Sequence, residues 1–218
     1  MRNIVNIFEA ESGEPSGAGD AYATARKQVR KKSPEASEED HMTTAEYFAT
    51  PETLIPQELI FGTIRVADAP FVSHQRLVLR LATALQAHAD ETYAGEVFVA
   101  PIDVVLDREK ALVLQPDLLF VSASRKDIVR ERIHGAPDLV IEVLSPRPRI
   151  GDLEERVHWF AHYGVREIWL YNQVDLQLHV LGCDAGAVQW RTTCDAGTPI
   201  TSAILPDFRQ TMQSVLER

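Results

Sequence analysis

The chain has 218 residues, 45% of them hydrophobic, which is enough to bury one core and carry an additional segment. A formal net charge of −10 excludes a generally basic nucleic-acid-binding protein, although a local basic rim beside a metal stays compatible with nucleic acid. No apolar run approaches the roughly 20 residues that span a bilayer. Two cysteines, Cys183 and Cys194, make no disulfide framework. We therefore expect a cytoplasmic protein without a membrane segment or signal peptide.

The N-terminal part of the chain is polar. Residues 9–42 are rich in Glu, Ser, Gly, Ala and Pro, and they cannot bury enough apolar surface to offset the entropy of ordering. We expect residues 1–42 to form a flexible tail, with at most a short helix near residues 20–32. The basic run 26–32 could contact a nucleic-acid backbone, but a solvated segment is the favoured interpretation. The folded domain is expected over residues 43–218.

The domain is predicted to open with a short helix near residues 43–48, capped by Thr44. Residues 59–66 then predict a strand, a turn at Gly62 and a second strand. The clearest helix follows, because four apolar residues share one of its faces: Leu77, Leu81, Ala84 and Leu85.

The remainder of the chain predicts further strands and two helices. A helix is expected from about residue 153 to 162, ended by Gly164. A hairpin near residues 176–181 and a closing helix over residues 208–216 follow. The other strands are expected at residues 96–100, 102–106, 115–121, 138–144 and 167–171. This order of elements is typical of a mixed α/β (α+β) fold.

The most informative side chain is a carboxylate inside an apolar strand. Glu142 lies in the middle of residues 138–144, a run that predicts a strand buried on both faces. A charge in such a strand is costly unless it is paired, protonated or coordinated. A second acid, Asp117, lies in the apolar run 115–121. Two acids on neighbouring buried strands indicate a site for a hard divalent cation.

Six sequence blocks occur in a characteristic order, at residues 57–62, 73–75, 97–104, 115–121, 134–146 and 164–170. In content and spacing they resemble the Uma2 family of restriction-endonuclease-like proteins, within the PD-(D/E)XK nuclease superfamily. The resemblance covers about residues 44–180. It implies a restriction-endonuclease-like fold, with a mixed central sheet flanked by helices. The activity that it implies is metal-dependent hydrolysis of DNA phosphodiester bonds.

The resemblance also implies four catalytic residues. Asp117 matches the acid of the "PD" element, Glu142 matches the acid of the (D/E)XK element, and Glu58 matches an acid near the start of the domain. The family usually carries its lysine on the following helix, where this chain has Arg156. Asp117 and Glu142 would hold Mg²⁺ or Mn²⁺. A homodimer would suit a nuclease that cuts both DNA strands, although the sequence carries no dimerisation motif.

The role of Arg156 has several possible interpretations. Arg156 can supply charge and a bidentate grip on phosphate, but it stays protonated and cannot act as a base. It could instead pair with Asp152 or with Glu142 as a structural ion pair. A catalytically weakened or inactive nucleic-acid-binding or assembly protein on the same fold is therefore the alternative to a nuclease. A metal-dependent hydrolase of a small phosphorylated substrate is a third hypothesis.

Other polar residues favour structural roles. Asp138 is expected to fix a turn, and Asp103 faces either the site or solvent. His74 caps the first long helix or faces the substrate, with the structural role favoured. His158 and His162 have the spacing of a zinc pair, but the glutamate of a His-Glu-x-x-His motif is absent, which favours a solvated helix face.

Overall fold

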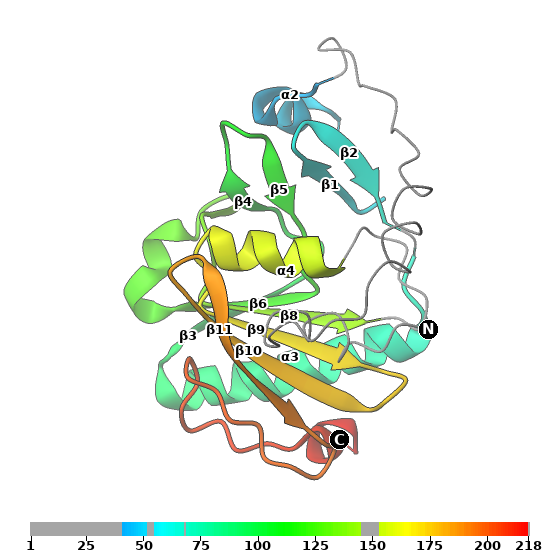
Figure 1. Cartoon of the computed structure of the whole chain (residues 1–218), viewed down its shortest axis with the longest axis vertical. Coiled ribbons are helices and arrows are strands. Elements are labelled where there is room, and N and C mark those ends of the chain that lie inside the picture. The colour runs from blue at the N-terminus through cyan, green and yellow to red at the C-terminus, as the bar shows by residue number, and fades with distance from the viewer. Residues whose placement is uncertain (1–40, 52–54, 68, 145–152, 218) are drawn as a thin grey trace, which may run out of the picture. The chain divides into compact units, whose positions relative to one another are not determined.

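A computed structural model describes residues 41–51, 55–67, 69–144 and 153–217 (Figure 1). Contacts divide the chain into two units, Met1–His41 and Met42–Arg218. All described residues except His41 belong to the second unit, so the helix considered near residues 20–32 lies outside the described part. No helix within these ranges is long and apolar enough to cross a membrane.

Five strands of the described ranges form one sheet, in the order β2-β1-β5-β4-β7. Its strands pair antiparallel, except that β4 and β7 are parallel. The predicted turn between the first two strands is confirmed, and Phe61 and Gly62 both have positive φ angles there. The bounds are β1 (Gln57–Ile60), β2 (Thr63–Val66), β4 (Val104–Asp107), β5 (Leu112–Leu114) and β7 (Ile133–His134).

Six further strands, counted over the same part of the chain, form a second sheet in the order β11-β10-β9-β8-β6-β3. Its pairs are antiparallel except for β8 with β9. The bounds are β3 (Gly95–Val99), β6 (Leu118–Ser122), β8 (Leu139–Leu144), β9 (Glu167–Asn172), β10 (Gln177–Asp184) and β11 (Ala187–Cys194). The predicted mixed α/β class is confirmed, with the strands distributed over two mixed sheets.

The N-cap of the first helix lies one residue before the predicted position. Helix α2 (Thr44–Ala49) is capped by Thr43 and not by Thr44. The Thr43 side chain accepts a hydrogen bond from the Glu46 backbone, and the Glu46 carboxylate accepts one from the Thr43 backbone, which completes a capping box. Thr44 is instead buried, and its hydroxyl donates to the carbonyl of Arg108 at 2.8 Å.

The remaining helices surround the second sheet. Helix α3 (Val72–Thr92) lies against one face and α4 (Leu153–His162) against the other (Figure 1). A short 3-10 helix, η4 (Ala123–Ile128), follows β6. The closing helix, α5 (Met212–Leu216), begins later than the predicted residue 208.

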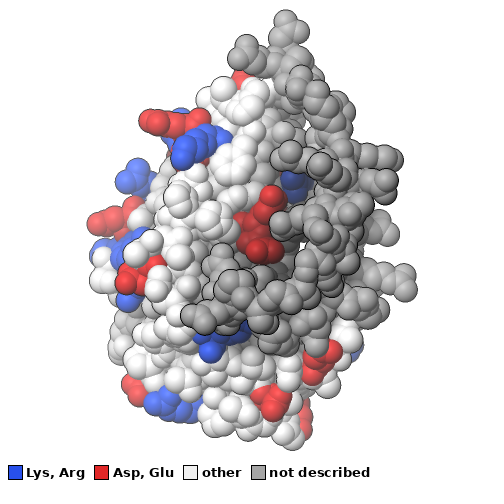
Figure 2. All heavy atoms as spheres, viewed as in Figure 1, with Lys and Arg blue, Asp and Glu red and all other residues white. Residues whose placement is uncertain are grey.

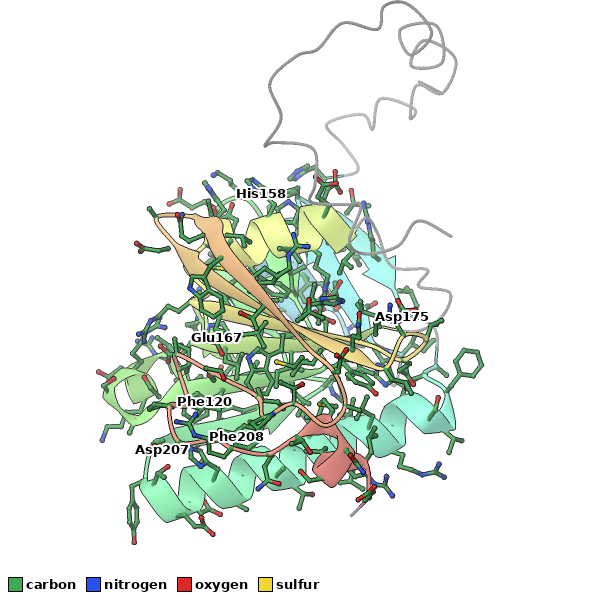
Figure 3. All side chains as sticks on the ribbon, turned by 60° about the horizontal axis from the view of Figure 1, so that its bottom comes forward. Phe120, His158, Glu167, Asp175, Asp207 and Phe208 are labelled. Carbon is green, nitrogen blue, oxygen red and sulfur yellow. The ribbon has the colours of Figure 1, made fainter. Side chains whose placement is uncertain are left out.

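The largest hydrophobic core lies between α3 and the six-stranded sheet. Figure 3 shows Phe120 and Phe208 in this layer, above α3. Ile141 and Val143 of β8 belong to the same core. Because side chains alternate along a strand, Glu142 points to the opposite face, which α4 covers. The carboxylate is therefore directed away from the core and toward α4.

Candidate active site

Asp117, just before β6, lies opposite Glu142, which is inside the neighbouring strand β8. In the β6–β8 pair, Leu118 is opposite Ile141 and Leu119 is opposite Val140. One further step along this register places Asp117 opposite Glu142, so both side chains are on the same face of the sheet. Asp117 precedes β6 and is not within the strand. Its Oδ2 accepts a hydrogen bond from the Val143 backbone at 2.7 Å, which holds it beside β8.

Arg156 of α4 joins Glu142 of one sheet to Glu58 of the other. Its Nε donates to Glu142 Oε1 at 2.7 Å and its Nη1 donates to Glu58 Oε2 at 2.8 Å. The second oxygen of Glu58 accepts from the Gln115 backbone at 2.6 Å. Exposed fractions of the Arg156, Glu58 and Glu142 side chains are only 10%, 5% and 13%. The fold thus brings the four predicted residues into one cluster, and the Glu142–Arg156 ion pair considered from the sequence is present.

The cluster carries more carboxylates than cations. Burial raises the pKa of Glu142 to about 7; Arg156 opposes this rise, while Asp117 and Glu58 add to it. Burial alone would lower the pKa of Arg156, but Glu142 and Glu58 outweigh it and raise that pKa above its ordinary value. The pKa of Glu142 thus rises mainly through burial, whereas that of Arg156 rises because two carboxylates surround it. The excess negative charge of the cluster suits an additional cation.

His74 belongs to this cluster, in a role that the sequence did not assign. It lies in the first turn of α3, whose N-cap residue is Phe71, so His74 is not the cap. Its Nε2 is 3.1 Å from Asp117 Oδ2. Burial by itself would lower the pKa of His74. The hydrogen bond and the charge of Asp117 raise this pKa by more than burial lowers it, so the net shift is upward. His74 and the Val143 backbone together fix the orientation of Asp117. The family-like block at residues 73–75 was the signal in the sequence.

The donor set fits a hard divalent cation. Asp117 Oδ1 and Glu142 Oε2 accept no hydrogen bond from any described residue, whereas the other oxygen of each carboxylate does. No group of three His, Cys, Asp or Glu side chains within the described ranges could hold a metal. Two carboxylate oxygens, completed by water and substrate phosphate, match the coordination that Mg²⁺ prefers.

Another buried glutamate, Glu167 of β9, differs from Glu142 in its hydrogen bonds (Figure 3). Its Oε1 accepts from Trp169 Nε1 at 2.7 Å and from Ser202 Oγ at 2.5 Å, and its Oε2 accepts from the Ala203 backbone at 2.7 Å. Each oxygen is occupied by a donor of the protein. Glu167 therefore anchors the segment after β11, and burial alone does not identify a catalytic acid.

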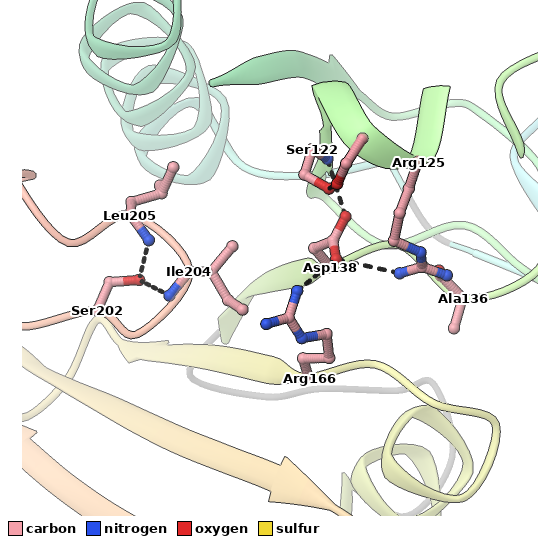
Figure 4. Close-up of polar contacts among 9 residues, drawn as sticks. Ser122, Arg125, Ala136, Asp138, Arg166, Ser202, Ile204 and Leu205 are labelled. Atoms are coloured by element: carbon pink, nitrogen blue, oxygen red, sulfur yellow. Dashed lines mark hydrogen bonds and ion pairs between the residues drawn. The ribbon is translucent and has the colours of Figure 1, made fainter. Parts of the chain in front are cut away.

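Asp138 also has a structural role (Figure 4). Fully buried, it accepts hydrogen bonds from the Ser122 backbone at 2.8 Å, from Arg125 at 3.1 Å and from Arg166 at 3.0 Å. Burial would raise its pKa, but these hydrogen bonds lower it below the ordinary value. Asp138 fixes the start of β8, as expected for a turn residue.

The other polar residues singled out from the sequence lie outside the cluster. Asp103 pairs with Arg132, with 3.2 Å between Arg132 Nε and Asp103 Oδ2. The rings of His158 and His162 stack on α4 with centroids 5.8 Å apart. On the face drawn in Figure 2, the basic and acidic side chains of the described residues are interspersed and form no single basic stripe.

A family model described as "Uma2: Putative restriction endonuclease" matches residues 44–213. The chain belongs to the Uma2 family. A solved structure with a similar fold is the crystal structure of a putative nuclease belonging to DUF820 from Anabaena variabilis ATCC 29413. Its TM-score is 0.67 at 16% identity, and the match covers 81% of this chain and 98% of that chain. No curated protein matches. The resemblance to the Uma2 family is thereby confirmed.

Proposed function

We propose that this Uma2 protein is a nuclease that hydrolyses DNA phosphodiester bonds with Mg²⁺ or Mn²⁺ held by Asp117 and Glu142. One observation carries the proposal: two opposed, half-buried carboxylates each keep one oxygen without a hydrogen bond from the described residues. The description of the family and the fold shared with a protein named as a putative nuclease support the same activity.

The side chains of the cluster have separate tasks. A bound divalent ion would polarise the phosphate and make bound water a stronger nucleophile. Asp117 is oriented for binding by His74 and the Val143 backbone. Arg156 keeps its positive charge, and its Nη2 donates no hydrogen bond to the described residues, so this nitrogen is the donor left for a phosphate oxygen. Glu58 holds Arg156 in place from the other sheet.

Cleavage of supercoiled plasmid and single-stranded DNA, with Mg²⁺ or Mn²⁺ and with EDTA, tests the proposal. Glu142→Ala and Asp117→Ala are expected to abolish cleavage, and EDTA is expected to stop the wild type. The exposed Asp207→Ala variant is the matched control and should cleave as the wild type does. Cleavage that survives in both Asp117→Ala and Glu142→Ala contradicts the assignment of the site.

A second candidate function is nucleic-acid binding or assembly on the same fold, with weakened or absent cleavage. Its support is specific: Arg156 stands where the family usually has lysine, is tied to two carboxylates, and cannot accept a proton. This function predicts salt-sensitive DNA binding without turnover, and cleavage that appears in Arg156→Lys. Rapid cleavage by the wild type rejects it, as does the absence of DNA binding at low salt.

A further inference from the structure

A cavity of about 680 Å³ borders the candidate site, between the end of β3 and the segment before β7. We propose that this cavity is a subsite for one unpaired nucleotide adjacent to the cleaved bond, so that the substrate is single-stranded DNA. This inference rests on the proposed nuclease function and names its substrate class. The residues that carry it are Phe98, Ile102, Gln115 and Arg132; the wall also contains the acids Asp103 and Glu131, both of which contact Arg132.

Backbone hydrogen bonds join the wall of the cavity to the carboxylate cluster. Gln115 lies two residues before Asp117, at most about 7 Å along an extended chain, which is a reach that one nucleotide covers. The Gln115 backbone donates to Glu58 at 2.6 Å, and the Ala100 backbone donates to the carbonyl of Asp117 at 3.0 Å. A strand with its scissile phosphate at Asp117 therefore places a neighbouring nucleotide at this cavity.

Arg132 is held in position for a phosphate. Its Nε donates to Asp103 at 3.2 Å, and its guanidinium carbon lies 3.9 Å from the centre of the Phe48 ring. Gln115 Nε2 in turn donates to Asp103 at 2.9 Å. The Arg132 side chain remains 32% exposed, and its Nη1 has only a 4.0 Å contact with Glu131. An arginine fixed on two sides, with its outer edge open, loses little freedom when it binds phosphate.

The rest of the wall suits a base. Phe98 and Ile102 contribute apolar side chains to the wall, on the face of the sheet that Asp117 and Glu142 share. The buried Gln115 Oε1 accepts no hydrogen bond from the described residues, and an N–H group of a base, such as N3–H of thymine, would satisfy it. Bases in a duplex are stacked and paired, so a base enters such a cavity only from a single strand or after flipping out.

Fluorescence anisotropy with a fluorescein-labelled 20-nucleotide oligothymidylate tests the subsite, in EDTA to prevent cleavage. Arg132→Gln is expected to weaken binding about tenfold, as loss of one charged hydrogen bond should. It should also reduce the salt slope, log K against log [KCl], by about 0.7, which corresponds to one phosphate contact with a single strand. Arg130→Gln removes the same charge from the same segment, at an exposed position outside the cavity wall, and should leave the slope unchanged.

A second pair of variants leaves the Asp103–Arg132 ion pair intact. Ile102→Trp adds bulk to the cavity wall and should weaken binding of the single strand at least fivefold, on the scale of one lost base contact. Val174→Trp, at an exposed position outside the wall, is the control. Thermal melting confirms that each variant is folded. A 20-base-pair duplex should bind the wild type more weakly than the single strand.

The results separate the subsite from the nuclease function. Equal effects of Arg132→Gln and Arg130→Gln, unchanged binding by Ile102→Trp, or duplex binding as tight as single-strand binding overturn the subsite while a cleaving wild type keeps the nuclease proposal. Displacement of the oligonucleotide by equimolar thymidine 5′-monophosphate also overturns it, in favour of a free nucleotide. A wild type that neither binds nor cleaves DNA removes the proposed function itself.

Discussion

Replacing Arg156 with methionine would leave two buried carboxylates, Glu58 and Glu142, without their shared cation. Methionine keeps most of the volume, so the main change is electrostatic. All three side chains are at most 13% exposed, so solvent screens the lost pairs poorly. Breaking a buried ion pair by removing one partner costs about 3–5 kcal/mol. In a domain of this size, each kcal/mol shifts Tm by about 2–4 °C, so we expect Tm to fall by roughly 6–20 °C at pH 8.

Thermal denaturation at pH 8 and pH 6 measures this effect. The pKa of Glu142 is already raised to about 7, and loss of Arg156 raises it further. Glu142 is then protonated at pH 6, so the penalty should be smaller there. Arg166→Met is the matched control because Arg166 is 58% exposed and its partner, Asp138, keeps its bonds to Ser122 and Arg125.

The control should lose no more than about 1 kcal/mol, as an exposed ion pair does. A loss in Arg156→Met no larger than in Arg166→Met, at both pH values, would refute the conclusion that Arg156 is a buried link between the two sheets. The double variant Arg156→Met/Glu142→Gln should recover part of the stability, because one of the two unpaired charges is gone.

Three further predictions concern the remaining carboxylates. The folded pKa of Glu142, about 7, lies above its ordinary 4.5, so the wild type should lose stability relative to Glu142→Gln as pH rises from about 4.5 to 7 in EDTA, by on the order of 1–3 kcal/mol in urea denaturation. His74→Ala should lower Mn²⁺ affinity about 10–100-fold by calorimetry, because Asp117 loses its positioning partner; unchanged affinity contradicts that role. Asp138→Ala should cost about 1–3 kcal/mol in urea denaturation, because the Ser122 backbone N–H loses its acceptor and two partly exposed arginines lose their shared carboxylate; the lowered Asp138 pKa means that this stabilisation is present above pH 3.8 in the wild type and is lost as pH falls through the folded pKa.

Elements with a strong pattern were predictable from sequence. Helix α3 and strand β8 follow from periodicity and from a continuous apolar run, since both patterns record which faces are buried. Strand β5, with three residues, is too short to carry a pattern and was missed. The N-cap of α2 was misplaced by one residue because Thr43 and Thr44 are chemically equivalent candidates, and only the capping-box contact with Glu46 distinguishes them.

The cost of placing a charge among apolar residues is visible in the linear sequence, and it is enough to single out Asp117 and Glu142. The partners of such an acid are residues distant from it in sequence. Arg156 and Glu58 are 98 residues apart and belong to different layers, and His74 reaches Asp117 across 43 residues. Distant residues also decide whether both oxygens of a buried carboxylate accept hydrogen bonds. For Glu167, two of the donors come from the segment at residues 202–203. Periodicity reports burial, whereas the hydrogen-bond partners of a buried acid are set by how the sheets and helices pack.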